Sequence, residues 1–304
     1  MKNKSMDSQL RSAIIAGCGY TGRRVARLWM ERGLQVYAIT RSASKLDDLR
    51  RDGITPIQLN LADATALPLL PDADVVLWSV GFDQTSGVPR EAIWIEGLQR
   101  FLSALPTRRE PRRIIYTSST SVYGNGHGQD VDETTLPNPK SEGGIACLAA
   151  EALLQGYARG TADCISILRL AGIYGPNRLL RKVTDLRNGT PIPAPPDEWL
   201  NLVHVDDAAA MTDCISLLDS PPKLVNVVAN NSVTRRQYYT LLASLSNSPP
   251  PVFAESADST GFRRGGNRRV VSVVRDELPV QFRYDSIAQG LPAALLHEDH
   301  AATL

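Results

Sequence analysis

The sequence has few of the features that mark metal sites, secreted proteins or membrane proteins. Its four cysteines are widely spaced, without a Cys-x-x-Cys pair, and its four histidines are scattered, which argues against a zinc site and suits a reducing compartment. The longest apolar runs have only the length of a strand. Residues 1–11 are polar and lack the apolar centre of a signal peptide. We therefore expect a cytoplasmic protein with no membrane partner.

An excess of charge of one sign is also missing. The 33 Lys and Arg residues nearly balance the 32 Asp and Glu residues, which gives a net charge of +1. Binding to nucleic acid or to a membrane surface usually needs a basic face, so we expect neither partner. With 304 residues, of which 43% are hydrophobic, the chain is long enough for one large α/β domain, or for a domain with a smaller lobe.

A glycine-rich turn lies near the start of the chain. A short apolar run ends at Ala16, the pattern Gly17-x-Gly19-x-x-Gly22 follows, and a helical pattern comes next. Gly17 permits a tight turn, Gly19 lets a pyrophosphate approach the backbone, and Gly22 lets the helix pack against the strand. The helix N-terminus then attracts phosphate. The residues expected to bind a dinucleotide here are Gly17, Gly19, Tyr20, Thr21 and Gly22. The alternative is a glycine-rich turn without a ligand.

Strand-like and helix-like segments alternate through the first half of the chain. The expected strands are 13–16, 35–39, 55–59, 74–80, 112–117 and 164–170. The expected helices are 21–33, 43–52, 90–105 and 143–159. This alternation predicts an α/β fold, a doubly wound parallel Rossmann sheet with a small C-terminal α/β substrate lobe.

The expected domains are each built from separate parts of the chain. Residues 12–172 and 201–229 form the NAD(P)-binding Rossmann domain. Proline and glycine are denser later, and we assign 173–200 and 230–290 to the substrate-binding lobe. Residues 1–11 and 291–304 are expected to be flexible termini.

The end of the second expected strand indicates which dinucleotide binds. An NAD site usually has Asp or Glu there, but this chain has Thr40 and then Arg41. A guanidinium can clamp the extra phosphate of NADP, so we favour NADP over NAD; the alternative is a solvated surface arginine. Ligands bind at the carboxyl ends of strands in such sheets, so we add the residues that end the fourth strand. These are Ser79, Val80 and Gly81.

Several motifs in order resemble a known superfamily. After the glycine turn come Tyr-Thr-Ser-Ser-Thr-Ser-Val-Tyr-Gly at 116–124, Arg-Leu-Ala-Gly-Ile-Tyr-Gly-Pro at 169–176 and Val-His-Val-Asp-Asp-Ala-Ala at 203–209. The series resembles the extended short-chain dehydrogenase/reductases, the NAD-dependent epimerase/dehydratase group. The resemblance implies an NAD(P)-dependent oxidoreductase or epimerase/dehydratase-like enzyme that acts on a nucleotide sugar or another small carbonyl or hydroxyl compound. It also implies that Asn60 and Leu61 lie near the adenine.

The catalytic residues that the resemblance implies are only partly present. The family uses a Ser or Thr, a Tyr and a Lys. Ser119 takes the first position, but Gly143 and Cys147 stand where the Tyr and Lys belong. The glycine turn departs as well, because the group's usual first glycine is replaced by Ala16. Tyr123 is either a substitute proton donor or a packed structural tyrosine.

These departures leave two functions open. The retained Ser119 favours an enzyme, whereas the missing Tyr and Lys favour a non-catalytic NAD(P)-binding sensor or scaffold. Helices 90–105 and 143–159 match the family's dimer interface, so a homodimer is expected. A basic cluster around residue 266 fits either packing or phosphate contact; its members are Arg263, Arg264, Arg268 and Arg269.

Overall fold

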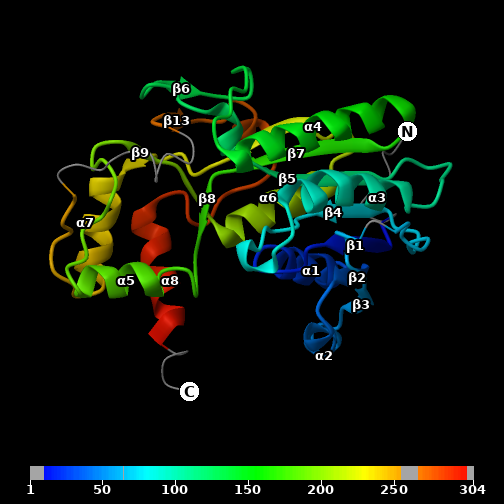
Figure 1. The fold of residues 1–304 in the computed structure, drawn as a ribbon, viewed down its shortest axis with the longest axis horizontal. Helices are drawn as coiled ribbons and strands as arrows, with labels where there is room; N and C mark the ends of the chain where they lie inside the picture. Colours follow the sequence, from blue (N-terminus) through cyan, green and yellow to red (C-terminus); the bar gives the residue numbers. More distant parts are fainter. Residues whose placement is uncertain (1–9, 64, 255–265, 300–304) are drawn as a thin grey trace. The chain divides into compact units, whose positions relative to one another are not determined.

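The structure, a computed structural model, describes residues 10–63, 65–254 and 266–299. Within them the chain forms a seven-stranded sheet in the order β11-β7-β5-β4-β1-β2-β3 (Figure 1). Its strands are β1 Ser12–Ala16, β2 Gln35–Thr40, β3 Thr55–Gln58, β4 Val75–Trp78, β5 Arg113–Ser119, β7 Cys164–Leu170 and β11 Leu224–Val227. The pairs β1·β2, β1·β4, β2·β3 and β4·β5 are parallel, with Ala13 opposite Val36 and Val75. The predicted fold class is confirmed.

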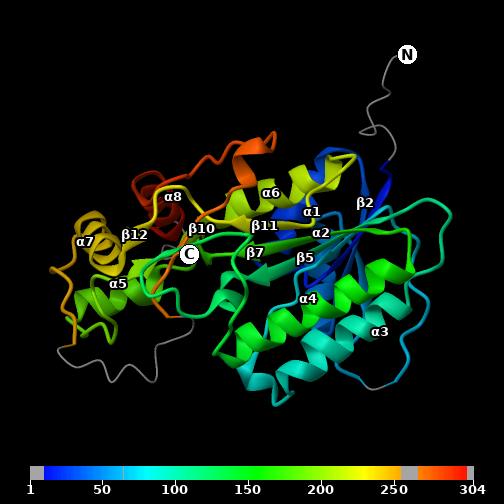
Figure 2. The ribbon, with the colours of Figure 1, turned by 90° about the horizontal axis from the view of Figure 1, so that it is seen from above.

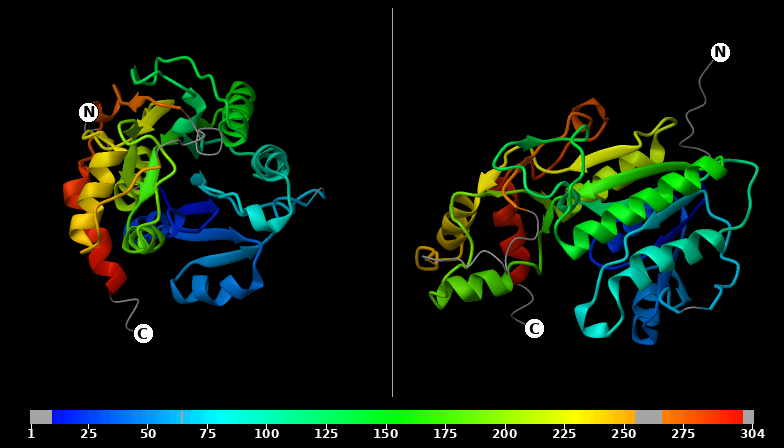
Figure 3. Two further views of the ribbon diagram at one scale, coloured as in Figure 1. Left: turned by 60° about the vertical axis from the view of Figure 1, so that its left-hand side comes forward. Right: turned by 45° about the horizontal axis from the view of Figure 1, so that its top comes forward.

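Helices cover both faces of this sheet (Figures 2 and 3). The α-helices of the described chain, including those of the second unit, are α1 Gly22–Glu31, α2 Leu46–Arg51, α3 Leu98–Ser103, α4 Glu142–Gly160, α5 Leu180–Arg187, α6 Val205–Leu217, α7 Arg235–Leu245 and α8 Ile287–Asp299. Helices α3 and α4 lie side by side on one face, where Phe101 and Leu154 pack with Trp78. Helices α1 and α6 are joined by Trp29 Nε1, which donates to Ser216 Oγ at 3.2 Å.

Two expected helices are divided in the structure. The segment 43–52 forms a 3-10 turn, Ala43–Lys45, and then α2. The segment 90–105 contains a π-helical turn, Ala92–Gly97, before α3. Arg100 donates to the carbonyl of Ala92, at the start of the π-helical turn, and to that of Leu61 in the segment after β3, so it ties this turn to that segment. The periodicity of apolar residues cannot distinguish an α-helix from a 3-10 turn or a π-helical turn, because all three place apolar residues at similar spacings.

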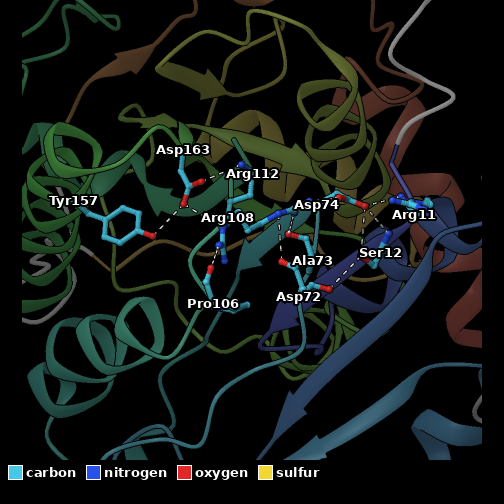
Figure 4. Close-up of polar contacts among 10 residues, drawn as sticks. All are labelled: Arg11, Ser12, Asp72, Ala73, Asp74, Pro106, Arg108, Arg112, Tyr157 and Asp163. Atoms are coloured by element: carbon cyan, nitrogen blue, oxygen red, sulfur yellow. Dashed lines mark hydrogen bonds and ion pairs between the residues drawn. The ribbon is translucent and has the colours of Figure 1, made fainter. Parts of the chain in front are cut away.

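Ion pairs connect the amino ends of the sheet strands (Figure 4). Asp74, just before β4, accepts from Arg108 at 2.8 Å and from the backbone N–H groups of Arg11 and Ser12. Asp163, just before β7, lies 3.2 Å from Arg112 Nε and accepts the Tyr157 hydroxyl at 3.0 Å. These carboxylates neutralise arginines and fix the starts of the strands.

Backbone contacts divide the described chain into two compact units. The first contains the chain up to Ser118, Ile145–Arg169 and Ala209–Val225, and it holds most of the sheet. The second contains Ser119–Gly144, Leu170–Ala208 and the chain from Asn226. These units are defined by contacts, so the predicted domain boundaries stay a prediction.

The second unit has its own core and short strand pairs. Tyr174, Val183 and Leu242 pack together with buried residues of α8. The short pairs are β8 Gly172–Tyr174 with β10 Leu202–His204, β9 Trp199–Leu200 with β12 Val233–Thr234, and β6 Asp130–Val131 with β13 Arg269–Val270.

The C-terminal segment differs from its expectation. Residues 291–299 belong to α8, with Leu291 and Ala294 fully buried, so this part is a packed helix rather than a flexible terminus. Residues 1–9 and 300–304 lie outside the described residues. Among the helices that the structure describes, none is both long and apolar enough to cross a bilayer. Across the described ranges, no three His, Cys, Asp or Glu side chains gather as metal ligands would.

Candidate functional site

The glycine turn connects β1 to α1 with the backbone that its glycines allow. Gly17 has φ +88°, and a Cβ there would lie 2.3 Å from the carbonyl oxygen of Ser79. A Cβ at Gly22 would lie 2.6 Å from the carbonyl oxygen of Gly17, so only glycine lets α1 start this close to the turn. A Cβ at Gly19 would meet no atom within 4 Å, which leaves room beside the backbone.

The N-terminus of α1 suits a negatively charged group. Thr21 is the N-cap residue but makes no side-chain cap, and no acidic residue lies in the first turn. The positive end of the helix dipole therefore has no carboxylate of its own. Burial raises the pKa of the neighbouring Cys18 thiol to about 12, so this side chain adds no negative charge to the turn.

The end of β2 carries the two residues expected to select NADP. Arg41 donates to Asp83 at 2.5 Å, and both side chains are nearly half exposed. Hydrogen bonds from Thr85, and then that from Arg41, lower the pKa of Asp83. Thr40 Oγ1 accepts the N–H of Ser42 at 3.3 Å. Arg41 is thus already paired with Asp83, and a bound phosphate would have to compete with that carboxylate.

Asn60 and Leu61 form a tight turn after β3. The Asn60 side chain donates to Asp63 at 2.6 Å and accepts the N–H of Ala62 at 3.2 Å. Leu61 is buried, and its carbonyl accepts from Arg100. Both of these contacts of Asn60 lie within the turn, so they shape its backbone; a contact with adenine stays a prediction.

The carboxyl end of β4 lies against the glycine turn. Ser79 N–H donates to Ala16 O at 2.8 Å, and Val80 is close to Gly17. Gly81 is exposed, with open space where a Cβ would be. The structure therefore brings Gly17, Ser79 and Gly81 together at the carboxyl end of the sheet strands. Parallel pairing places the end of β2 at the same edge.

Cys147 faces inward from α4. Its side chain is buried, with the side chains of Tyr116 and Ser118 near its thiol. Burial raises the pKa of the Cys147 thiol, so it is not an activated nucleophile. Burial, and then the nearby Cys147 and Glu151, raise the pKa of the Tyr116 hydroxyl well above its usual value. Gly143 lies one turn earlier on the same helix.

A buried ion pair ties α4 to two strands. Glu151 accepts from Arg169 on β7 at 2.7 and 3.1 Å and from the Ser118 hydroxyl on β5 at 2.6 Å. Glu151 and Arg169 are almost completely buried. Removing one partner would leave an uncompensated charge, so this network fixes α4 on the sheet. The sequence alone assigns no role to Glu151, because its partners come from distant strands.

Ser119 ends β5 and caps the turn that follows it. Its Oγ accepts the N–H of Ser121 at 3.1 Å, which leaves the hydroxyl hydrogen available to donate elsewhere. Arg268 donates to the carbonyls of Thr120 and Gly124 at 2.7 and 2.6 Å and so holds this turn. Burial lowers the pKa of Arg268 to about 10.

Of the basic cluster predicted around residue 266, Arg268 therefore packs against the turn after Ser119. Arg269 pairs with Asp130 on the surface. Arg263 and Arg264 lie outside the described residues.

Tyr123 is buried in the second unit. Its hydroxyl donates to Asn226 Oδ1 at 2.8 Å, and Asn226 in turn donates to the carbonyl of Val271. A phenol has one hydrogen to donate, and here that hydrogen is directed at Asn226. Tyr123 would need a different hydrogen-bond arrangement to protonate a substrate, and its catalytic role stays a prediction.

Comparison with known proteins adds to this geometry. The model of the NAD-dependent epimerase/dehydratase family matches residues 13–227. A curated relative is "Protein YeeZ" of Escherichia coli strain K12, with 30% identity over 286 residues, which cover 90% of this chain and 97% of that protein.

Solved structures share the fold over nearly the whole chain. A conserved protein of unknown function from Silicibacter pomeroyi is 26% identical, with a TM-score of 0.76 and coverage of 95% of this chain and 99% of that one. A UDP-glucuronic acid 4-epimerase from Bacillus cereus, in complex with NAD, is 19% identical, with a TM-score of 0.75 and the same coverage. The second likeness shows the fold alone.

Proposed function

We propose a cofactor and a substrate class for this chain, which belongs to the NAD-dependent epimerase/dehydratase family. The chain binds NADP in preference to NAD. It acts on a nucleotide sugar or another small carbonyl or hydroxyl compound. The family consists of enzymes. The observation that carries the cofactor proposal is the glycine turn, where Gly17, Gly19 and Gly22 have the backbone and the space that a dinucleotide needs.

The residues present fit a dinucleotide. The pyrophosphate would lie at Gly19 and the N-terminus of α1, which carries no acidic residue in its first turn. The adenosine end would lie near Asn60, Leu61 and Thr40, and Arg41 would exchange Asp83 for the phosphate of NADP. The nicotinamide end would lie beyond Ser79, Val80 and Gly81. When bound, the nicotinamide supplies or accepts hydride.

Ser119 is the residue of this chain that we assign to the substrate oxygen. Its Oγ already accepts from Ser121, so its hydroxyl hydrogen can be donated to a carbonyl oxygen and stabilise the charge that develops there. Arg268 fixes the turn and hence the direction of this donor. Gly143 has no side chain to donate a proton, so another donor completes the reaction.

The test is turnover with saturating NADPH against keto-sugar nucleotides, aldehydes and quinones, followed by absorbance. We expect oxidation of NADPH with at least one of these classes. Ser119→Ala should lower kcat roughly 100-fold, as removal of one oxyanion donor does elsewhere. Ser103→Ala, a change on the exposed surface of α3, is the matched control. Undiminished turnover in Ser119→Ala would remove Ser119 from the mechanism.

A non-catalytic NAD(P)-binding sensor or scaffold is the second candidate. It is favoured by Gly143 and by Cys147, a buried thiol with a raised pKa at the position of the family's lysine. Firm cofactor binding without NADPH oxidation across the whole panel would support it against the enzyme.

We also propose a homodimer through residues 90–105 and 143–159, and a cytoplasmic location. Ile145 on α4 keeps 53% of its surface exposed, as an interface residue would in a single chain. The four cysteines are all free, which suits a reducing compartment. Sedimentation of the purified protein tests the dimer: a monomer at micromolar concentration would contradict it.

A further inference from the structure

Arg90 is clamped between two aromatic rings beyond the carboxyl end of β4. The guanidinium carbon lies 4.0 Å from the centroid of the Phe82 ring and 5.0 Å from that of Trp94. The two rings meet edge to face, with centroids 6.1 Å apart. Arg90 precedes the π-helical turn Ala92–Gly97, which contains Trp94. Contacts with two rings restrict the guanidinium to few orientations, so it is positioned before any ligand arrives.

This guanidinium has no hydrogen-bond or ion-pair partner among the residues that the structure describes. No hydrogen bond or ion pair joins Arg90 to any of them, although its side chain is partly buried. Arg90 Nε and Trp94 Nε1 are buried N–H groups that donate to no acceptor in the same ranges. Partly buried arginines usually pair with a carboxylate, and buried N–H groups are usually satisfied. The pattern leaves the guanidinium open to an acceptor that does not belong to the described residues.

Arg90 belongs to the segment that follows β4, whose first residues Ser79 and Val80 lie against the glycine turn. Its positive charge acts on Cys147 of α4, the residue at the position of the family's lysine, and opposes the effect of burial on that thiol. Tyr116 and Ser118 lie near the same Cys147 side chain. A cation is thus present near this position, but it comes from the segment after β4 rather than from α4.

We propose that Arg90, held by Phe82 and Trp94, binds an oxyanion of the substrate, either a carboxylate or a phosphate group. A guanidinium fork can donate to two oxygens of such a group at once. The glycine turn and α1 already offer a place for the cofactor's pyrophosphate, which leaves this second cationic site for the substrate. The assignment rests on the proposed function, because it takes the anion to belong to that enzyme's substrate.

The test follows the indole N–H signal of Trp94 by nuclear magnetic resonance in 15N-labelled protein saturated with NADPH. The signal is assigned from its loss in Trp94→Phe. Inorganic phosphate and malonate are the probes. We expect a saturable shift with at least one probe, and an apparent Kd at least 10-fold weaker in Arg90→Gln. Arg50→Gln removes an exposed arginine of α2 and should leave the titration unchanged. Saturation by phosphate alone indicates a phosphate group, and saturation by malonate alone indicates a carboxylate.

Three results would overturn the proposal. The first two are no saturable shift with either probe, and an affinity of Arg90→Gln equal to that of the wild type. The third is a shift that appears only without NADPH, since the site would then belong to the cofactor. Arg90→Lys keeps the charge but loses the fork, so its affinity should lie between those of the wild type and Arg90→Gln; this variant replaces Arg90→Gln if the latter fails to fold. NADPH binding is measured on the same samples. Failure of the wild type to bind NADPH contradicts the proposed function, and the titration of the cofactor-free protein then tests Arg90 separately.

Discussion

The two ends of the sheet in the first unit use arginine differently. At the amino ends of the strands, Arg108 pairs with Asp74, and Arg112 pairs with Asp163 (Figure 4). Beyond the carboxyl end of β4, Arg90 contacts the rings of Phe82 and Trp94 and has no ion-pair partner within the described part of the chain. Arg41, at the carboxyl end of β2, has an acidic partner, but that pair is exposed to solvent.

This difference in pairing indicates that the arginines at the amino end stabilise the fold and that Arg90 at the carboxyl end serves ligand binding. A buried arginine whose charge is neutralised by a carboxylate of the same chain stabilises the fold and is not open to a ligand from solvent. A charge without such a partner lowers stability unless a ligand supplies the counter-charge, and open α/β sheets bind their ligands at the carboxyl ends. Substitutions at the amino end should therefore change unfolding, and those at the carboxyl end should change binding.

The largest effect is expected at the amino end. Asp163→Asn would leave Arg112, whose side chain is 2% exposed, without its counter-charge. The free energy of unfolding should fall by about 3 kcal/mol, with NADPH affinity unchanged. Urea denaturation measures the first and a fluorescence titration the second. Asp72→Asn, at a carboxylate that is 59% exposed, is the control and should cost less than about 0.5 kcal/mol. Equal losses in the two variants would contradict the assignment of the amino end to stability.

Gly19→Ala should have the next largest effect, on binding alone. A Cβ at Gly19 meets no protein atom within 4 Å, so the fold tolerates it, but it occupies the side from which we expect the pyrophosphate to approach. We expect NADPH to bind roughly 30-fold more weakly, about 2 kcal/mol, with unfolding unchanged. Gly160→Ala, at the end of α4, also meets no atom and should change neither quantity. An unchanged Kd in Gly19→Ala would place the cofactor elsewhere.

A smaller effect is expected at the end of β2, where Arg41 and Asp83 should act in opposite directions. Arg41→Gln should weaken NADP binding about 10-fold and NAD binding much less, because only NADP carries the phosphate. Asp83→Asn should strengthen NADP binding, since it frees Arg41 from its partner. Parallel calorimetric titrations with both dinucleotides measure this. If NAD binds the wild type more tightly than NADP, the role given to Arg41 is wrong.

The smallest effect is a pH dependence at the amino end. Burial alone would raise the pKa of Asp74, but hydrogen bonds from Arg108 and from the N–H groups of Arg11 and Ser12 outweigh it, so the pKa lies below its ordinary value of 3.8. The carboxylate therefore stabilises the fold above pH 3.8, and this contribution is lost as the pH falls through the lower, folded-state pKa. Asp74→Asn should cost about 1 kcal/mol at pH 6 and progressively less on acidification. A difference from the wild type that stays constant from pH 6 to pH 3 in urea denaturation would exclude this origin.

Much of the first unit could be predicted from local sequence. The alternation of segments predicted the six strands from β1 to β5 and β7, and the glycine pattern predicted the tight turn at Gly17. These features depend on residues close together in the chain. The helix α8 was missed: its ordered state depends on burial of Leu291 and Ala294 in a core that the local sequence does not reveal.

The sequence by itself determined the family, the α/β fold and the glycine turn, because backbone geometry and hydrophobic periodicity are properties of short segments. Only the tertiary structure decided which charges are paired. It joined Glu151 to Arg169, placed Arg268 on the turn after Ser119, directed the Tyr123 hydroxyl to Asn226, and left Arg90 between two rings. The partners in these contacts come from different elements, so chain topology rather than sequence spacing brings them together.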